Sequence, residues 1–248
     1  MGSPSQDVQE IEAGGHRVVL GRDSLRALDR ALGKADATAL FILGDVNTMR
    51  QCLPELLARV PHLRDARTLS VPGGEGSKDL AVCAGIWQHL ANHAADRQAL
   101  LVCLGGGVVT DLGGFVAGTY KRGIACVHVP TSLLGMVDAS IGGKTGVDLG
   151  GVKNMVGVFH DPLGVYIHMP FLKSLGKREL LNGLAEMIKH GLVWDASHWE
   201  AIAASALHDI DALAPLVYRS AAIKAEVVQQ DPRESGLRKV LNFGHTIG

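Results

Sequence analysis

Short apolar segments alternate with helical segments along the first two thirds of the chain. Four apolar runs have the length of a β-strand, at 39–43, 68–71, 99–104 and 125–129. Segments with the helical spacing of apolar residues lie around and between them, at 24–32, 49–60 and 77–94. Strands that alternate with helices are typical of a parallel sheet covered by helices. We therefore predict an α/β fold with a Rossmann-like parallel sheet.

The pattern changes at about residue 177. Strand signals stop there, and helical segments follow at 178–193, 198–206, 212–230 and near Leu237. We expect two domains, an α/β domain at 1–176 and an α-helical domain at 177–248.

Composition and charge narrow the class of protein. Hydrophobic residues make up 47% of the 248 residues and charged residues 20%, which is typical of a globular protein. Lys plus Arg (24) nearly balances Asp plus Glu (25), so we expect neither nucleic acid nor an anionic membrane as partner. No apolar stretch reaches the ~18 residues of a membrane helix, and the first residues lack a signal-peptide pattern. The four cysteines are at least 20 residues apart with no CxxC pair, so we expect a reduced, cytoplasmic chain.

A triple glycine, 105–107, follows the apolar run at 99–104 and precedes a helical pattern at 112–118. Glycines at this place let backbone N–H groups approach a pyrophosphate at the start of a helix. Against the dinucleotide-binding fingerprint, Thr110 stands where the third glycine belongs. A tight strand-to-helix turn explains the same glycines equally well.

Two further glycine-rich segments carry lysines. The segment 142–145 ends like an ATP-binding P-loop, but Asp138 stands where the first glycine of that motif belongs, which excludes an ATPase of that kind. Lys144 and Lys153 together suit an anionic substrate, although each alone fits a solvated loop. In segment 73–78, Glu75 suits either a ribose or the first turn of a helix.

Polar residues share one face of the helical segment 178–193. Asn182, Glu186, Lys189 and His190 lie on it, which is typical of a solvated face or of a face that lines a ligand. On a ligand-lining face, Glu186 would coordinate a metal and Lys189 would hold an anion. Near the end of the chain, Arg238, Asn242 and His245 have the same kind of spacing. A carboxylate and an imidazole form a common zinc set, but spacing alone does not bring Glu186 to His245.

Taken together, these segments resemble the 3-dehydroquinate synthase family of the sugar-phosphate cyclase superfamily. The motifs that carry the resemblance run in family order: Gly-Gly-Glu-Gly-Ser-Lys (73–78), Gly-Gly-Gly-Val-Val-Thr-Asp-Leu-Gly-Gly-Phe (105–115), Tyr-Lys-Arg-Gly (120–123), Val-Pro-Thr-Ser-Leu-Leu-Gly-Met-Val-Asp-Ala-Ser-Ile-Gly-Gly-Lys-Thr (129–145), Lys153-Asn154, Gly-Leu-Ala-Glu-Met-Ile-Lys (183–189) and Arg-Lys-Val-Leu-Asn-Phe-Gly-His-Thr-Ile-Gly (238–248).

The resemblance implies an NAD-binding α/β domain, an α-helical metal-binding domain and a homodimer. The implied NAD contacts are Asp45, Glu75, Lys78, Gly107, Val108, Val109, Thr110, Asp111, Thr131, Ser132, Lys144, Lys153, Phe171, Leu172, Lys173 and Ser174. The implied ligands of zinc (or cobalt) are Glu186 and His245. The implied substrate contacts are Lys144, Asn154, Lys189, Lys224, Arg238 and Asn242, with Arg122 reaching across the dimer and Asp138 in the same pocket.

The implied substrate is 3-deoxy-D-arabino-heptulosonate 7-phosphate, and the implied product is 3-dehydroquinate, in the shikimate pathway of aromatic amino acid biosynthesis. In such a reaction, a metal polarises a hydroxyl and NAD accepts hydride from the adjoining carbon. The ketone acidifies its neighbouring C–H, so phosphate is eliminated, and fixed cations stabilise the anions that form. Hydride then returns, and ring opening and an aldol closure complete the reaction.

The chain departs from the family pattern at its end. The family pattern continues with Gly-His after Thr246-Ile247, and a further zinc-binding histidine lies downstream, whereas this sequence ends at Gly248. We therefore expect the helical domain of this polypeptide to be incomplete and the polypeptide itself to be inactive or severely impaired. The alternatives are another sugar-phosphate cyclase, a non-catalytic NAD-binding fragment, and a polyol dehydrogenase of the iron-dependent type.

Overall fold

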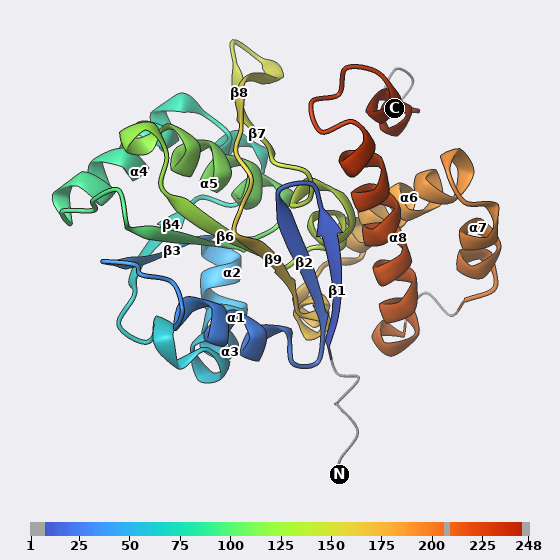
Figure 1. Ribbon diagram of the computed structural model, residues 1–248, viewed down its shortest axis with the longest axis horizontal. Coiled ribbons are helices and arrows are strands. Elements are labelled where there is room, and N and C mark those ends of the chain that lie inside the picture. Colours follow the sequence, from blue (N-terminus) through green and yellow to red (C-terminus); the bar gives the residue numbers. More distant parts are fainter. Residues whose placement is uncertain (1–7, 206–208, 245–248) are drawn as a thin grey trace.

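A seven-stranded sheet lies at the centre of the fold (Figure 1), in the strand order β1-β2-β9-β6-β5-β3-β4. The computed structural model describes residues 8–205 and 209–244. Neighbouring strands are parallel except β1 and β2, which form an antiparallel hairpin at one edge. The strand bounds are β1 Val8–Ala13, β2 His16–Gly21, β3 Leu40–Asp45, β4 Arg67–Val71, β5 Leu100–Gly105, β6 Ala125–Pro130, β7 Lys144–Leu149, β8 Val152–Phe159 and β9 Gly164–Ile167. The predicted α/β fold with a mainly parallel sheet is confirmed.

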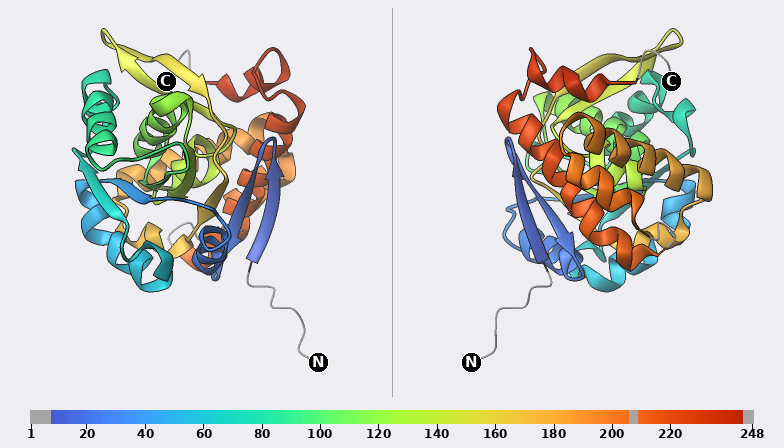
Figure 2. Two further views of the ribbon diagram at one scale, coloured as in Figure 1. Left: turned by 60° about the vertical axis from the view of Figure 1, so that its left-hand side comes forward. Right: turned by 90° about the vertical axis from the view of Figure 1, so that its right-hand side faces the viewer.

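Helices cover both faces of this sheet, as the views in Figures 1 and 2 show. Successive residues of a strand point to opposite faces, so Ile42 joins one core while Phe41 and Leu43 join the other. Helices α1 and α3 pack on the first face, and α4 and α5 pack on the second. The bounds in this part are α1 Ser24–Leu32, α2 Val46–Gln51, α3 Leu53–Arg59, η1 Pro61–Leu63, η2 Glu75–Ser77, α4 Leu80–Asn92, α5 Gly107–Thr119, η3 Tyr120–Arg122, η4 Gly135–Ala139 and η5 Met169–Ser174.

The helix predicted at 49–60 is two helices, α2 and α3, which meet at Cys52. Pro54 lies in the first turn of α3, where its missing N–H leaves no bond unmade. The helix predicted at 77–94 begins later, because the carboxylate of Asp79 caps α4 by accepting a hydrogen bond from the Ala81 N–H.

Two hairpins were not among the predicted elements. Strands β1 and β2 turn at Gly14-Gly15, and strands β7 and β8 turn at Gly150-Gly151. Gly150 and Gly151 have φ angles of 60° and 80°, which suit the tight turns that join antiparallel strands. A Gly-Gly pair between two segments of alternating polar and apolar residues is the sequence signal for such a hairpin. We did not predict these hairpins from it.

The C-terminal part is helical, as expected, and lies beside the sheet (Figure 2). Helix α6 starts within one residue of its predicted start. Residue 206, at the predicted end of the helix at 198–206, is outside the described residues. The segment near Leu237 is a 3₁₀-helix. The bounds are α6 Lys177–Val193, α7 Ala196–Ala203, α8 Ile210–Gln230 and η6 Leu237–Asn242.

Loops at one edge of the sheet position the site. The parallel strands β3, β4, β5, β6 and β9 all end there, and each is followed by a segment with predicted ligand contacts. From β3 the chain continues to β4 on one side and later to β5 on the other, so the strand order reverses between β3 and β5. Ligands of open α/β sheets bind at such a reversal point.

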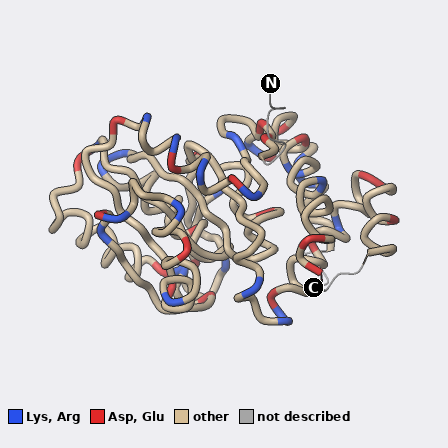
Figure 3. Tube along the Cα trace, turned by 90° about the horizontal axis from the view of Figure 1, so that it is seen from below, with Lys and Arg blue, Asp and Glu red and all other residues tan. Residues whose placement is uncertain are grey.

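Figure 3 shows Lys and Arg interspersed with Asp and Glu along the described trace. No helix within residues 8–205 and 209–244 is both long and apolar enough to cross a membrane. All four cysteines are free and buried.

Candidate active site

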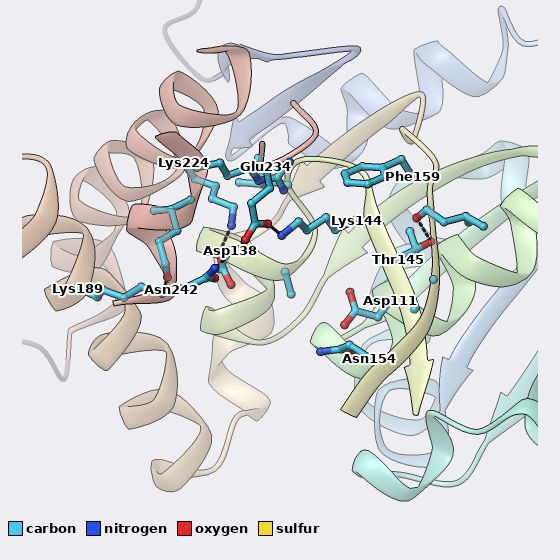
Figure 4. A pocket seen from close by; sticks show the side chains of 17 residues that line it. Asp111, Asp138, Lys144, Thr145, Asn154, Phe159, Lys189, Lys224, Glu234 and Asn242 are labelled. Carbon is cyan, nitrogen blue, oxygen red and sulfur yellow. Dashed lines mark hydrogen bonds and ion pairs between the residues drawn. The ribbon is translucent and has the colours of Figure 1, made fainter. Parts of the chain in front are cut away.

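A cavity of about 530 Å³ lies between the β7–β8 hairpin and the helices α6, α8 and η6 (Figure 4). Both the sheet side and the helical side of the molecule therefore contribute to its wall. Its lining residues are Asp111, Asp138, Ala139, Ile141, Lys144, Thr145, Gly146, Asn154, Gly157, Val158, Phe159, Lys189, Lys224, Glu234, Arg238, Leu241 and Asn242.

Nearly all of the predicted substrate contacts line this one cavity. They come from η4, both strands of the hairpin, α6, α8 and η6, which are far apart in the sequence. The exception is Arg122, which lies in η3 beside Asp96 and Gln98, in a different hollow. The members that line the cavity are Asp138, Lys144, Asn154, Lys189, Lys224, Arg238 and Asn242.

Ion pairs connect the cavity's cations to carboxylates. Lys224 pairs with Asp138, and Nζ of Lys189 lies 2.6 Å from Oε1 of Glu186. Burial opposes ionisation of Asp138, but the Lys224 ammonium outweighs it and holds the pKa of this carboxyl well below its usual range. These two pairs hold opposite charges close together on side chains that are mostly buried.

Lys144 is the first residue of β7, and its ammonium pairs with Glu234 (Figure 4). Glu234 lies in the loop after α8 and also accepts a hydrogen bond of 2.7 Å from Nδ2 of Asn242. Burial, helped by the charges of Arg238 and Lys224, lowers the pKa of Lys144 to about 8. Sequence reasoning missed Glu234, because no spacing connects this loop residue to the hairpin.

Arg238 is almost fully buried at the base of the cavity. Its guanidinium donates to the carbonyl of Gly142 at 3.0 and 3.1 Å and to the carbonyl of Pro232 at 2.8 Å. The loop before it is ordered by Asp231, whose carboxylate accepts from the N–H groups of Ser235, Gly236 and Arg238. Those backbone hydrogen bonds lower the pKa of Asp231 to about 2.

Three side chains of the types that ligate metal ions lie close together beside the cavity. One donor atom each of Asp138, Glu186 and His190 lies within 4.8 Å of the others. Asp138 lies in a π-helical turn, while Glu186 and His190 are one turn apart on α6, with 3.4 Å between Oε1 and Nε2. Among the described residues, neither nitrogen of His190 has a hydrogen-bond partner, although His190 is fully buried, whereas Oε1 of Glu186 is paired with the Lys189 ammonium. Buried polar atoms without partners are typical of a place that receives an ion or water, so this group fits a divalent cation.

Of the two predicted metal ligands, the structure describes only Glu186. Glu186 belongs to the three-residue group, whereas His245 lies outside the described residues, so its ligand role stays a prediction. His190 was placed on the polar face of this helix but was given no role. The signal that finds it is its spacing of four residues from Glu186, which places both side chains on one side of a helix.

Most of the predicted NAD contacts lie in the segments that follow the parallel strands, while Lys144 and Lys153 lie in the β7–β8 hairpin. The N–H groups at the start of α5 have no side-chain cap, because Gly106 is the N-cap residue. A Cβ at Gly106 would lie 3.0 Å from Oγ of Ser132, and one at Gly107 would lie 3.1 Å from Cβ of Ala139. A side chain at either glycine would therefore fill the space before the helix, and the glycines leave it open to a phosphate.

Lys78 connects this region to the cavity. It is buried, and its ammonium donates to Oδ2 of Asp111 at 2.8 Å and to Oδ1 of Asn154 at 2.5 Å. Burial raises the pKa of Asp111 to about 6, although the Lys78 charge opposes the rise.

Other predicted NAD contacts have different surroundings. The carboxylate of Asp45 caps α2. Lys153 is exposed near the hairpin tip, 3.6 Å from Glu75, so it does not converge with Lys144 in the cavity. Phe171 and Leu172 are buried in the core, which leaves mainly their backbone for a ligand. The remaining members follow β6, lie within α5 or lie in η5: Thr131, Ser132, Val108, Val109, Thr110, Lys173 and Ser174.

Comparison with known proteins identifies the class of enzymes that share this fold. Residues 68–182 match the family model of the 3-dehydroquinate synthase N-terminal domain, and residues 183–248 match that of its C-terminal domain. Among solved structures, 2-epi-5-epi-valiolone synthase from Streptomyces hygroscopicus subsp. jinggangensis, with NAD⁺ and Zn²⁺ bound, has a TM-score of 0.82 and 30% identity. The alignment covers 96% of this chain and 68% of that one. The fold is that of the sugar-phosphate cyclases.

Curated relatives narrow the class further. The 3-dehydroquinate synthase of Parabacteroides distasonis is 45% identical, over 94% of this chain and 66% of its own length. That of Corynebacterium pseudotuberculosis is 38% identical, over 97% of this chain and 69% of its own. The chain belongs to the 3-dehydroquinate synthase family, and it spans about two thirds of the length of these relatives.

Proposed function

We propose that the protein carrying this chain converts 3-deoxy-D-arabino-heptulosonate 7-phosphate into 3-dehydroquinate and phosphate. The observation that carries the proposal is the cavity. It is lined by four cations, Lys144, Lys189, Lys224 and Arg238, and it is bordered by Glu186 and His190 of helix α6. A substrate with a carboxylate, a phosphate and several hydroxyls needs such a mixture of cations and polar side chains.

In this proposal, the cations bind the anionic groups of the substrate. Lys144 and Arg238 line the cavity from different elements, β7 and η6, so a substrate bound to both is fixed in orientation as well as held. The amides of Asn154 and Asn242 are suited to its hydroxyls. When phosphate leaves, these fixed positive charges stabilise the departing anion without any rearrangement of solvent.

Proton transfer belongs to Lys144 in this proposal. With a pKa of about 8, its amine holds a proton at neutral pH and gives it up more readily than an ordinary lysine. Glu234 and Asn242 lie beside it, and an incoming anion would replace the Glu234 carboxylate as the partner of the ammonium.

The residues present fit both NAD and a divalent cation. Gly106, Gly107 and the first turn of α5 would hold the pyrophosphate, and Glu186 with His190 and Asp138 would hold the ion, with His245 as the further predicted ligand. When bound, NAD supplies a reversible hydride acceptor and the ion, zinc or cobalt, supplies a Lewis acid beside it. Lys78, which pairs with Asp111 on α5, also donates to Asn154 in the wall of the cavity.

We further propose that the protein is a cytoplasmic homodimer. Arg122 lies apart from the cavity of its own chain, which suits its predicted reach into the cavity of a partner.

Product analysis tests the proposed function. The protein is incubated with the heptulosonate phosphate, NAD⁺ and zinc, and phosphate and organic product are measured. We expect equal amounts of phosphate and 3-dehydroquinate, and their loss in Lys144→Met. Turnover of other sugar phosphates to a different cyclic product would instead identify another sugar-phosphate cyclase. NAD⁺ binding without any phosphate release would indicate a non-catalytic nucleotide-binding protein.

A further inference from the structure

The turn before Lys144 is held by hydrogen bonds from three parts of the chain. Gly142 and Gly143 have φ angles of 99° and 64°, which other residues rarely adopt. The carbonyl of Gly142 accepts from Arg238, and the carbonyl of Gly143 accepts from the His160 N–H at 2.8 Å. The turn thereby sets where β7 starts and where the Lys144 side chain leaves the backbone.

His16, from the N-terminal hairpin, holds the other backbone polar group of Gly142, its N–H. It is the first residue of β2 and is only 3% exposed. Its Nε2 lies 3.4 Å from the N–H of Gly142, and its Nδ1 lies 3.3 Å from Oδ1 of Asp161. An imidazole that accepts at Nε2 must carry its proton on Nδ1, and Asp161 is the acceptor for that proton. Burial lowers the pKa of His16, so the ring stays neutral, as this arrangement requires.

Asp161 also shapes the turn directly. Its carboxylate lies 2.5 Å from the position that a Cβ on Gly15 would take. It also occupies the position that a Cβ on Gly143 would take. The carboxylate thus fills the space between the turn of the β1–β2 hairpin and the turn before Lys144. His16 and Asp161 form one packed unit with the two glycines, although they are 145 residues apart.

We propose that His16 and Asp161 are positioning residues that fix the Gly142-Gly143 turn and, through it, the place of Lys144 in the cavity. The N-terminal hairpin is then part of the active-site support, and His16 and Arg238 hold the N–H and the carbonyl of the same residue, Gly142. The consequence for substrate binding rests on the function proposed above, whereas the fixation of the turn does not.

Amide hydrogen exchange tests the fixation without turnover. In His16→Phe, the Gly142 N–H loses its acceptor, and we expect its exchange to accelerate about tenfold or more. In His16→Gln, the side-chain oxygen replaces Nε2 as acceptor, so exchange returns toward the native rate. The matched control is His128→Phe, which removes another buried imidazole from the sheet without a hydrogen bond to this turn.

Asp161→Ala provides a second variant, because half of the Asp161 side chain is exposed and its loss is compatible with folding. We expect faster Gly142 exchange here as well, together with a KM for the heptulosonate phosphate raised about tenfold and a smaller change in kcat. His128→Phe should leave KM unchanged. Native exchange and KM in both His16→Phe and Asp161→Ala would overturn the proposal. If exchange accelerates while even the native protein releases no phosphate, the proposed function fails and the fixation of the turn stands.

Discussion

At the scale of single residues, the cavity depends on how its cations are partnered. Lys224 is paired with the carboxylate of Asp138, and Lys189 with that of Glu186. Arg238 instead donates to backbone carbonyls. Among the cations lining the cavity, Lys144 has a pKa shifted to about 8. Its charge therefore depends on pH in a range that is easy to measure.

Anion binding is expected to weaken as the pH rises through about 8. Below that pH, Lys144 carries a proton and attracts an anion, and above it the amine becomes neutral. The dissociation constant of inorganic phosphate, measured by calorimetry, should rise about tenfold across this step. In Lys144→Arg the charge persists, so the step should disappear. The same step in both proteins would assign it to another group.

Arg238→Lys is expected to lower the free energy of unfolding by about 1–3 kcal/mol, because an ammonium cannot reproduce the contacts to Gly142 and Pro232. Denaturant unfolding measures the change. The control is Arg219→Lys, a more exposed cation paired with Asp195 and Glu226, for which about 1 kcal/mol or less is expected. Equal losses in both variants would contradict the structural role given to Arg238.

The sequence predicted which residues belong to the site, but not which residues they contact. Lys144, Lys189 and Arg238 were all expected at the site, and the cavity contains them. The pairing of Lys144 with Glu234 was not expected, because local spacing carries no information about contacts between a hairpin and a distant loop. His190 was seen on the correct helix face but without a role.

At the scale of elements, α6 presents two of the three candidate metal ligands, Glu186 and His190, one turn apart. Glu186→Gln or His190→Asn is therefore expected to weaken zinc binding about 10- to 100-fold in a competition assay with a chelator. Glu179→Gln is the control, because Glu179 is an exposed residue on the same helix whose carboxylate contacts Asn182. Unchanged zinc affinity in both site variants would place the ion elsewhere.

The turn before β7 should tolerate no side chain. In Gly142→Ala, the new Cβ would meet Nη2 of Arg238 and lie 2.7 Å from Cγ2 of Val228, at a φ of 99°. We expect a loss of about 2–3 kcal/mol in the free energy of unfolding. Gly150→Ala is the matched control, because its φ is 60° and its Cβ would meet nothing within 4 Å, so about 1 kcal/mol is expected. Equal costs would show that the crowding at Gly142 is relieved.

The elements that sequence periodicity predicted best are those with one strong local signal. Helix α1 matches its predicted bounds, and the strands β3, β4, β5 and β6 were all expected, whereas the buried strand β9 was not. The hairpins β1–β2 and β7–β8 were overlooked, because their alternation is short and their turns resemble loops. Both hairpins turned out to support the site, at His16 and at Lys144.

At the scale of the whole molecule, the site exists only where the sheet edge meets the helices. Lys224 contacts Asp138 across 86 positions of sequence, and Arg238 contacts Gly142 across 96. No periodicity predicts such contacts, so the sequence predicted the two parts of the molecule but not the cavity between them. The family resemblance supplied the set of residues, and the structure shows which of them converge.

The most direct test of the central claim follows phosphate and NADH in the same sample. In the proposed function, NAD would serve as a reversible hydride acceptor and would not be consumed. The protein carrying this chain, supplied with the heptulosonate phosphate, NAD⁺ and zinc, is therefore predicted to release phosphate continuously while NADH absorbance stays near its starting value. Accumulation of NADH in step with turnover, without release of phosphate, would contradict the account and indicate a simple dehydrogenase.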